Sequence, residues 1–177
     1  HYFNLPDDYS VVYGNGGATL LFDMIGLGMV QSKSYHFTCG EFSKKWFKAH
    51  HKIPWVTAEE KAVDFGQGQV FEDASYIDAD MICVTLNETS TGVIIDDLPV
   101  VNEDQILAVD ATSGGGQVPC DLSKVDCYFF SPQKVFASEG GLFVAILSPK
   151  ARNRALKISE DTSRYIPEIM SWKKAIS

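Results

Sequence analysis

The sequence predicts an α/β fold built on one mostly parallel sheet, and three observations support this. Apolar runs of strand length alternate with longer helical patterns along the chain. Two of these runs, 81–86 and 106–109, are apolar at nearly every position, as in strands that are buried on both faces of a parallel sheet. Polar residues follow directly where these strands end, as is typical of a binding crevice in an open α/β sheet.

Size and composition indicate one domain, residues 1–177, that acts on small molecules. The chain has 177 residues, of which 45% are hydrophobic, enough for one sizeable core. Its net charge of -8 argues against nucleic acid and anionic membranes as partners. No apolar run approaches the roughly 20 residues that cross a bilayer. The chain begins at His1 without a methionine and ends in an expected loop, so we expect a fragment truncated at both ends.

The cysteines and histidines do not predict a metal site. The four cysteines lack a CxxC pair and are interpreted as reduced thiols of a cytoplasmic protein, each a small buried side chain. His36, His50 and His51 lack the i, i+4 spacing of a helical zinc site. We therefore expect no bound metal.

A glycine-rich turn near the amino terminus is the first candidate site. A short strand, Tyr9–Tyr13, is followed by Gly14-Asn15-Gly16-Gly17-Ala18-Thr19 and by a helix expected over residues 18–30. Free N–H groups and the positive end of the helix dipole suit this position to a phosphate. Because the run is neither GxGxxG nor a Walker A sequence, a plain strand-to-helix turn is the alternative.

A second strand and helix place an aromatic side chain at the same kind of turn. The strand is expected over residues 35–39, and Gly40-Glu41-Phe42-Ser43 opens a helix that runs toward His50. Phe42 is placed to lie on a heterocyclic ring, or else it is a core aromatic. Residues 57–80 are expected to form a surface connection with one or two short elements.

The next two strands end in polar groups. The run 81–86 leads into Asn87-Glu88-Thr89, and the run 106–109 ends at Asp110. A carboxylate at the end of a buried strand is costly unless a cationic or protonated group meets it, and a pyridinium N–H is one such group. The alternative for Asp110 is a turn-forming aspartate.

The strand 125–130 leads through Ser131-Pro132-Gln133 to Lys134, just before Gly140-Gly141. A lysine held at the mouth of a sheet can condense with an aldehyde, and this chemistry is most often carried by pyridoxal 5'-phosphate (PLP). Lys134 is therefore the candidate nucleophile, against the alternative of an ordinary solvated lysine. A further strand is expected over residues 141–147, a helix from Lys150 onward, and mixed structure after residue 158.

Taken together, these motifs resemble those of the phosphoserine aminotransferases, especially their actinobacterial-type branch, within the class V, fold-type I PLP-dependent enzymes. The resemblance covers nearly the whole chain. It is carried, in this order, by Gly14-Asn15-Gly16-Gly17-Ala18-Thr19, Gly40-Glu41-Phe42-Ser43, Asn87-Glu88-Thr89-Ser90-Thr91-Gly92-Val93, Asp110-Ala111-Thr112-Ser113-Gly114 and Pro132-Gln133-Lys134.

The resemblance implies a large PLP-binding domain, a homodimer, and a reaction in serine biosynthesis. It implies that Lys134 holds the cofactor covalently and shuttles a proton, that Asp110 pairs with the ring nitrogen, and that Phe42 stacks on the ring. It also implies that Thr89 bonds the phenolic oxygen and that Gln133 helps to bind the phosphate.

The remaining implied phosphate contacts come from Gly17, Ala18 and Thr19. Many relatives carry Trp in place of Phe42 and Arg in place of Thr19, so the stacking area is smaller and one phosphate contact must come from another group. The small C-terminal domain, the family's substrate-binding residues and the partner's threonine have no counterpart in this sequence. Alternatives are another class V enzyme, of the alanine-glyoxylate aminotransferase or cysteine desulfurase type, and a catalytically incompetent fragment.

Overall fold

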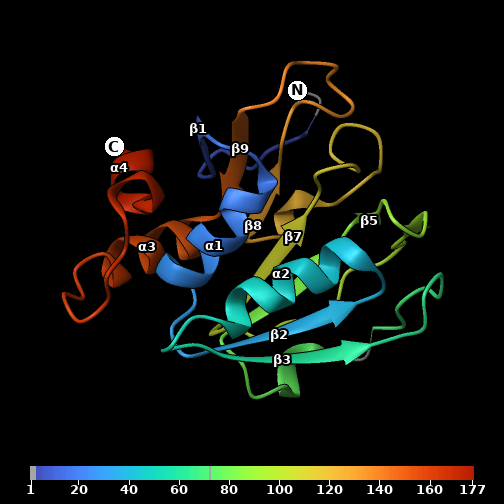
Figure 1. Ribbon diagram of the computed structural model, residues 1–177, viewed down its shortest axis with the longest axis horizontal. Coiled ribbons are helices and arrows are strands. Elements are labelled where there is room, and N and C mark those ends of the chain that lie inside the picture. Colours follow the sequence, from blue (N-terminus) through green and yellow to red (C-terminus); the bar gives the residue numbers. More distant parts are fainter. Residues whose placement is uncertain (1–2, 72) are drawn as a thin grey trace.

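A seven-stranded sheet forms the centre of the protein, with strand order β1-β9-β8-β7-β4-β2-β3 (Figure 1). The computed structural model describes residues 3–71 and 73–177, so His1, where the chain begins, lies outside the described residues. The strands of this sheet are β1 (Ser10–Asn15), β2 (Lys33–Thr38), β3 (Thr57–Ala62), β4 (Met81–Thr85), β7 (Ile106–Asp110), β8 (Cys127–Phe130) and β9 (Leu142–Leu147). A separate pair consists of β5 (Asn87–Glu88) and β6 (Val93–Ile94).

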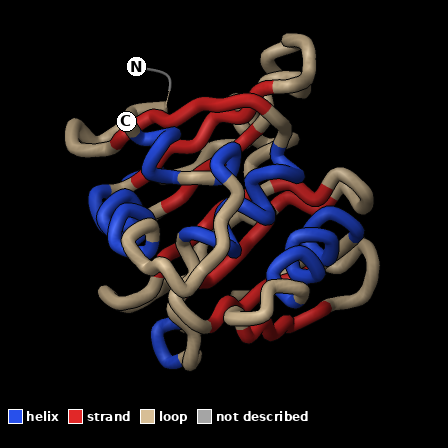
Figure 2. The backbone as a smooth tube through the Cα atoms, turned by 60° about the vertical axis from the view of Figure 1, so that its left-hand side comes forward, coloured by secondary structure: helices blue, strands red, loops and turns tan. Residues whose placement is uncertain are grey.

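The predicted mostly parallel sheet is confirmed. Strands β3, β2, β4, β7 and β8 are parallel neighbours, whereas β9 runs antiparallel to both β8 and β1. The carboxyl ends of all strands except β9 therefore meet at one edge of the sheet. Figure 2 shows the strands crossing the molecule side by side, with helices packed against them.

The four α-helices of the described chain are α1 (Ala18–Gly28), α2 (Glu41–His51), α3 (Pro149–Ile158) and α4 (Trp172–Ile176). All four contribute to one core cluster on one face of the sheet, which includes Leu21, Trp46, Ala151 and Trp172. The cluster on the opposite face contains none of the described α-helical residues. It is closed by connecting segments and by the 3-10 turns η1 (Ala74–Tyr76) and η2 (Leu122–Lys124). A third 3-10 turn, η3 (Glu168–Met170), contacts α1.

Residues 57–80 contain two short elements, as expected: β3, which pairs with β2 along its whole length as an edge strand, and η1. The expectation about the end of the chain was wrong. The end of the chain contains the short helix α4, where a loop was expected. Trp172 anchors this helix: its indole N–H donates to the Met24 carbonyl at 2.9 Å, and its side chain is buried.

No helix among the described residues is both long and apolar enough to cross a bilayer. All four cysteines are free thiols.

Candidate active site

A pocket of about 150 Å³ lies at the carboxyl edge of the sheet, between the start of α1, the ends of β4 and β7, and the loop after β8. All eight residues that the sequence predicted for the site line it: Gly17, Ala18, Thr19, Phe42, Thr89, Asp110, Gln133 and Lys134. Four further residues complete the lining: Phe22, Asn87, Thr112 and Ser113. Residues from five separate sequence motifs thus meet around one small space.

A larger cavity of about 530 Å³ lies at the opposite, amino-terminal edge of the strands, and we do not assign it as the active site. Two of its charged groups, Asp80 and Arg154, are already engaged with the protein. Asp80 accepts backbone N–H bonds from Gln31, Ser32 and Lys33, and Arg154 donates to the Asp80 carbonyl at 2.7 Å. Size alone therefore does not identify the site, whereas position at the carboxyl ends of the strands does.

The start of α1 forms the first wall of the pocket and suits an anion. Gly17 is the N-cap residue, no side chain of the described residues caps the helix, and its first turn has no acidic residue. By contrast, Ser148 accepts the N–H of Ala151 at the start of α3. The uncapped end of α1 leaves N–H groups and the positive helix dipole for a ligand.

Asp110, the last residue of β7, forms the second wall. It is only 3% exposed, and its Oδ1 accepts two bonds from Thr112, from N–H at 2.9 Å and from the hydroxyl at 2.5 Å. Burial raises the pKa of Asp110 to about 6, the Thr112 bonds oppose this, and the nearby Glu88 carboxylate adds to it. Within the described residues Oδ2 accepts no hydrogen bond, so a cationic N–H donor would fit there.

Lys134 forms the third wall, on the exposed loop between β8 and β9. The Lys134 carbonyl accepts the N–H of Ala137 at 3.1 Å, and the Pro132 carbonyl accepts that of Ser138 at 3.2 Å. These bonds fold the loop back on itself. Lys134 and Asp110 line the same pocket.

Hydroxyl groups connect the ends of β4 and β7. Thr89 donates to the Ser113 hydroxyl at 2.7 Å, and Ser113 donates to the Asn87 carbonyl at 2.9 Å. Sequence reasoning did not single out Asn87, Thr112 or Ser113 as site residues. They belong to the motifs after β4 and β7, and the strand-end rule applied to each residue would have found them.

Glu88 closes the start of α2, in contrast to the open start of α1. Its carboxylate is fully buried and accepts bonds from the Ser43 N–H and hydroxyl, both at 2.8 Å, from the Phe42 N–H at 3.2 Å and from the Ser90 hydroxyl at 2.8 Å. Burial raises the pKa of Glu88, but the bonds from Ser43, Ser90 and Phe42 outweigh it, so this pKa lies below its ordinary value. The carboxylate thus fixes the turn that presents Phe42, which is 42% exposed, to the pocket.

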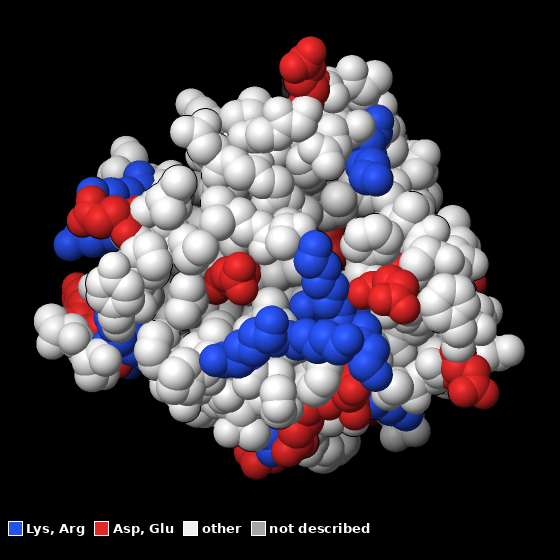
Figure 3. Space-filling view, viewed as in Figure 1, with Lys and Arg blue, Asp and Glu red and all other residues white. Residues whose placement is uncertain are grey.

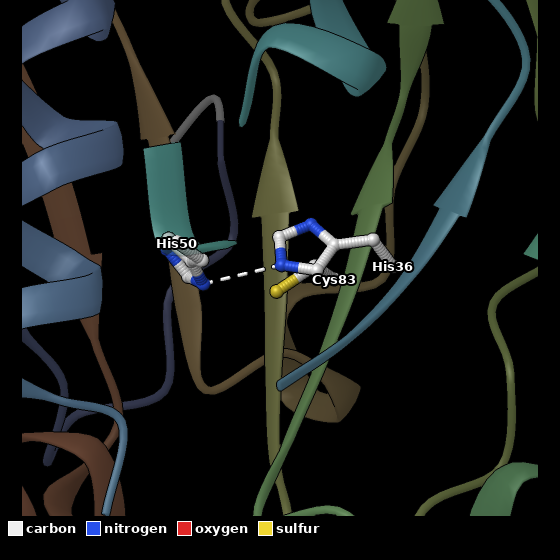
Figure 4. A group of neighbouring side chains, drawn as sticks. All are labelled: His36, His50 and Cys83. Carbon is white, nitrogen blue, oxygen red and sulfur yellow. Dashed lines mark hydrogen bonds between the residues drawn. The ribbon is translucent and has the colours of Figure 1, made fainter. Parts of the chain in front are cut away.

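A second group of titratable side chains lies deeper on the helical face of the sheet (Figure 4). It consists of His36 from β2, His50 from α2 and Cys83 from β4, whose potential ligand atoms lie within 4.8 Å of one another. His36 Nε2 and His50 Nδ1 are hydrogen-bonded at 3.1 Å, as the dashed line in Figure 4 marks.

The rest of the surroundings identify this group as part of the core. Ser34 Oγ lies 3.1 Å from His36 Nε2 and 3.0 Å from His50 Nδ1, and His50 Nε2 lies 3.0 Å from the Trp46 indole nitrogen. Burial lowers the pKa of His50 to about 3 and that of His36 well below its ordinary value, so both rings are neutral. His36 Nε2 and both ring nitrogens of His50 therefore already have hydrogen-bond partners within the protein. The i, i+4 rule could not detect a cluster drawn from three elements.

A parallel α/β sheet whose carboxyl edge joins an open helix end, a buried carboxylate and a loop lysine is the architecture of a cofactor-dependent transferase domain. The chain belongs to the class V aminotransferase family, whose sequence profile matches residues 54–165, more than half of the chain.

Comparison with known proteins gives relatives within this family. The chain is 41% identical over 175 residues to the phosphoserine aminotransferase of Corynebacterium glutamicum and 40% identical to that of Rhodococcus opacus. Each match covers 98% of this chain and 46% of the relative, so the chain spans about half the length of the curated relatives it matches.

Solved structures show the same fold. A phosphoserine aminotransferase from Cytophaga hutchinsonii is 30% identical with a TM-score of 0.81, over 98% of this chain and 50% of that one. The ureidoglycine-glyoxylate aminotransferase of Bacillus subtilis, 12% identical over 97% of this chain and 46% of that one, has a TM-score of 0.79 and shows the fold alone.

Proposed function

We propose that this chain is the PLP-binding large domain of an aminotransferase that moves the amino group between 3-phosphoserine and 2-oxoglutarate. The observation that carries the proposal is the pocket that Lys134 and Asp110 share with the uncapped start of α1. The 41% identity to a phosphoserine aminotransferase supports the choice of substrate over other class V reactions.

Asp110 would bind the cofactor through its ring nitrogen. When bound, PLP supplies an electron sink for the charge left on a substrate carbon that loses its proton. The Asp110 carboxylate can accept the pyridinium N–H, and the resulting charge pair would lower the pKa of Asp110 from its raised value. The Thr112 bonds to Oδ1 hold the carboxyl plane while Oδ2 accepts the ligand.

Lys134 would carry the covalent link and the proton. Its amine stands on a loop anchored between β8 and β9, so it can move without disturbing the sheet. Once released from the cofactor by substrate, Nζ would take the proton from the substrate α-carbon as a general base. It would then give the proton back as a general acid to complete the transfer.

The start of α1 would bind the phosphate of the cofactor. The backbone N–H groups of Ala18 and Thr19, with the Thr19 hydroxyl and the Gln133 amide, would hold the phosphate, while Phe42 would stack on the ring and Thr89 would bond its phenolic oxygen. In this proposal a small C-terminal domain and a second subunit of a homodimer complete the substrate site, and the reaction serves serine biosynthesis.

Covalent trapping tests the cofactor assignment. Incubation with PLP followed by borohydride reduction should fix the cofactor on Lys134, as located by peptide mapping, and Lys134→Ala should abolish this labelling. Lys157→Ala, which removes an exposed lysine on α3, serves as the matched control and should label normally. Label on another residue, or none in the unmodified protein, would overturn the assignment.

Single-turnover measurements test the substrate. In the full-length protein, phosphoserine should bleach the bound cofactor's absorbance much faster than alanine or cysteine does. Equal rates for the three amino acids would remove phosphoserine as the substrate and leave the cofactor assignment intact.

A further inference from the structure

Lys45 lies beside the pocket at the end where α1 begins. It belongs to the second turn of α2, and its Nζ donates to the Thr19 hydroxyl at 3.3 Å. Thr19 lines the pocket, whereas Lys45 is an exposed residue just outside it. The contact joins the second helix of the chain to the first turn of α1.

The charges of the pocket leave an anion without a full counter-charge. Among the lining residues Lys134 is the one cation, and the proposed function uses its amine for the covalent link. Asp110 contributes a carboxylate to the pocket, and Glu88 lies behind it. A helix end supplies only about half an elementary charge, so a phosphate dianion at α1 would be incompletely neutralised.

Lys45 is positioned to supply this charge and is not committed elsewhere. Among the described residues no carboxylate oxygen lies within 4.0 Å of its Nζ, whereas the preceding Lys44 pairs with Glu60 at 3.4 Å. Asp23, one turn along α1 from Thr19, feels the charge of Lys45 at longer range: burial raises the Asp23 pKa, and Lys52 and Lys45 oppose the rise.

Figure 3 shows that lysine and arginine side chains gather over α2 in a chain whose net charge is -8. The lysines of this helix are Lys44, Lys45 and Lys48. Among these three lysines of the described structure, Lys45 is the one whose amine bonds a pocket residue.

We infer that Lys45 is a phosphate-binding residue of the pocket, an inference that rests on the proposed function. An ammonium group has three donors, so Nζ can keep the Thr19 hydroxyl and also donate to a phosphate oxygen held at the start of α1. The lysine then contributes a point charge, and the helix end contributes directed N–H groups.

Binding of two forms of the cofactor tests the inference without measuring turnover. The affinity of the cofactor-free protein for PLP and for pyridoxal, which lacks the phosphate, is measured by absorbance titration at low ionic strength. Lys45→Gln should weaken PLP binding about tenfold, as expected for the loss of one charge-assisted contact. It should change pyridoxal binding less than about twofold, a factor that corresponds to a few tenths of a kcal/mol.

Two further variants distinguish a direct contact between Lys45 and the phosphate from the general electrostatic effect of a positive charge on α2. Lys48→Gln makes the same change in net charge one turn further along α2 and should leave the affinities for PLP and pyridoxal unchanged, and Lys45→Arg should preserve PLP affinity. Equal losses in Lys45→Gln and Lys48→Gln, equal losses for the two ligands, or no loss at all would overturn the role of Lys45. Failure of the unmodified protein to bind PLP would instead overturn the proposed function.

Discussion

Two groups of titratable side chains lie on the same face of the sheet: an inner group of His36, His50 and Cys83, and an outer group at the pocket that includes Asp110. They differ in whether their polar atoms are satisfied within the protein or face a pocket. Cys83 of β4 stands beside Ala108 of β7, and Thr85 stands beside Asp110, so the two groups are two residues apart along the same strands. In the inner group, His36 and His50 bond each other and Ser34 and stay neutral. In the outer group, the carboxyl of Asp110 has one oxygen satisfied by Thr112 and lines an open pocket.

The comparison shows how two residues along a strand separate a structural group from a reactive one. Two residues inward, every polar atom must find a partner within the protein or remain uncharged. At the strand end a carboxyl group can be buried by its neighbours and still face a space that a ligand can fill. Burial shifts the pKa in both groups, but only the outer group offers a ligand the chance to reverse the shift.

The largest expected effect concerns the inner group. His50→Ala removes a fully buried ring, leaves the Trp46 indole N–H without its acceptor and leaves the His36 ring with Ser34 alone as its partner. We expect the free energy of unfolding to fall by about 3 to 5 kcal/mol. Urea titration measures this, with His51→Ala, an exposed neighbour on the same helix, as the control that should change it by less than about 0.5 kcal/mol. If His50→Ala instead lowered the affinity for PLP and left the free energy of unfolding unchanged, the inner group would be part of the binding site and not of the core.

The next effect concerns Asp110 in the cofactor-free protein. Its pKa of about 6 in the folded state lies above the ordinary 3.8, so the folded state holds the proton more tightly than the unfolded state. The stabilisation is fully present below pH 3.8 and is lost as the pH rises through 6. Relative to Asp110→Asn, the unmodified protein should therefore lose about 2 to 3 kcal/mol of stability between pH 4 and pH 7.

The measurement is a set of urea titrations across this pH range with and without PLP. Bound PLP should remove most of the loss, since its ring N–H favours the charged carboxylate. A pH-independent difference between the two proteins would show that Asp110 is not buried as a proton-binding group.

The smallest effect concerns Glu88, whose pH dependence should have the opposite sign. Its folded-state pKa lies below the ordinary 4.5, so its stabilisation is present above that pH and is lost as the pH falls through the folded value. Glu88→Gln should cost about 1.5 to 3 kcal/mol at pH 7 and less in acid. Glu103→Gln, at an exposed carboxylate, should cost nothing measurable, and equal costs for both would contradict the role of Glu88 at the start of α2.

Much of the fold and the pocket could be predicted because polar residues follow directly after the apolar runs that form the buried strands. The buried strands β4 and β7 are visible as continuous apolar runs, and the rule for parallel sheets then brings the residues after them to one edge. For this reason Asp110 and Thr89, which are distant in sequence, could be assigned to one pocket.

Other features depend on contacts that have no local pattern. The edge strand β3 carries Thr57-Ala58-Glu59-Glu60-Lys61-Ala62, whose charged side chains look like a loop because an edge strand has little apolar surface to bury. The cap that Glu88 provides for α2 joins residues 45 positions apart. The inferred role of Lys45 likewise depends on a contact with Thr19, 26 positions away in the sequence.

The reversed direction of β9 ties the lysine loop to the glycine turn. The loop leaves the sheet from β8 and returns at once into β9, and the Gly141 carbonyl at its end accepts the N–H of Gly16 at 2.8 Å. Gly141, at φ +105°, and Gly16, at φ +113°, adopt a backbone region that favours glycine. The loop that carries Lys134 and the turn that opens α1 are therefore joined by a direct backbone hydrogen bond, so we expect a displacement of either segment to shift the other.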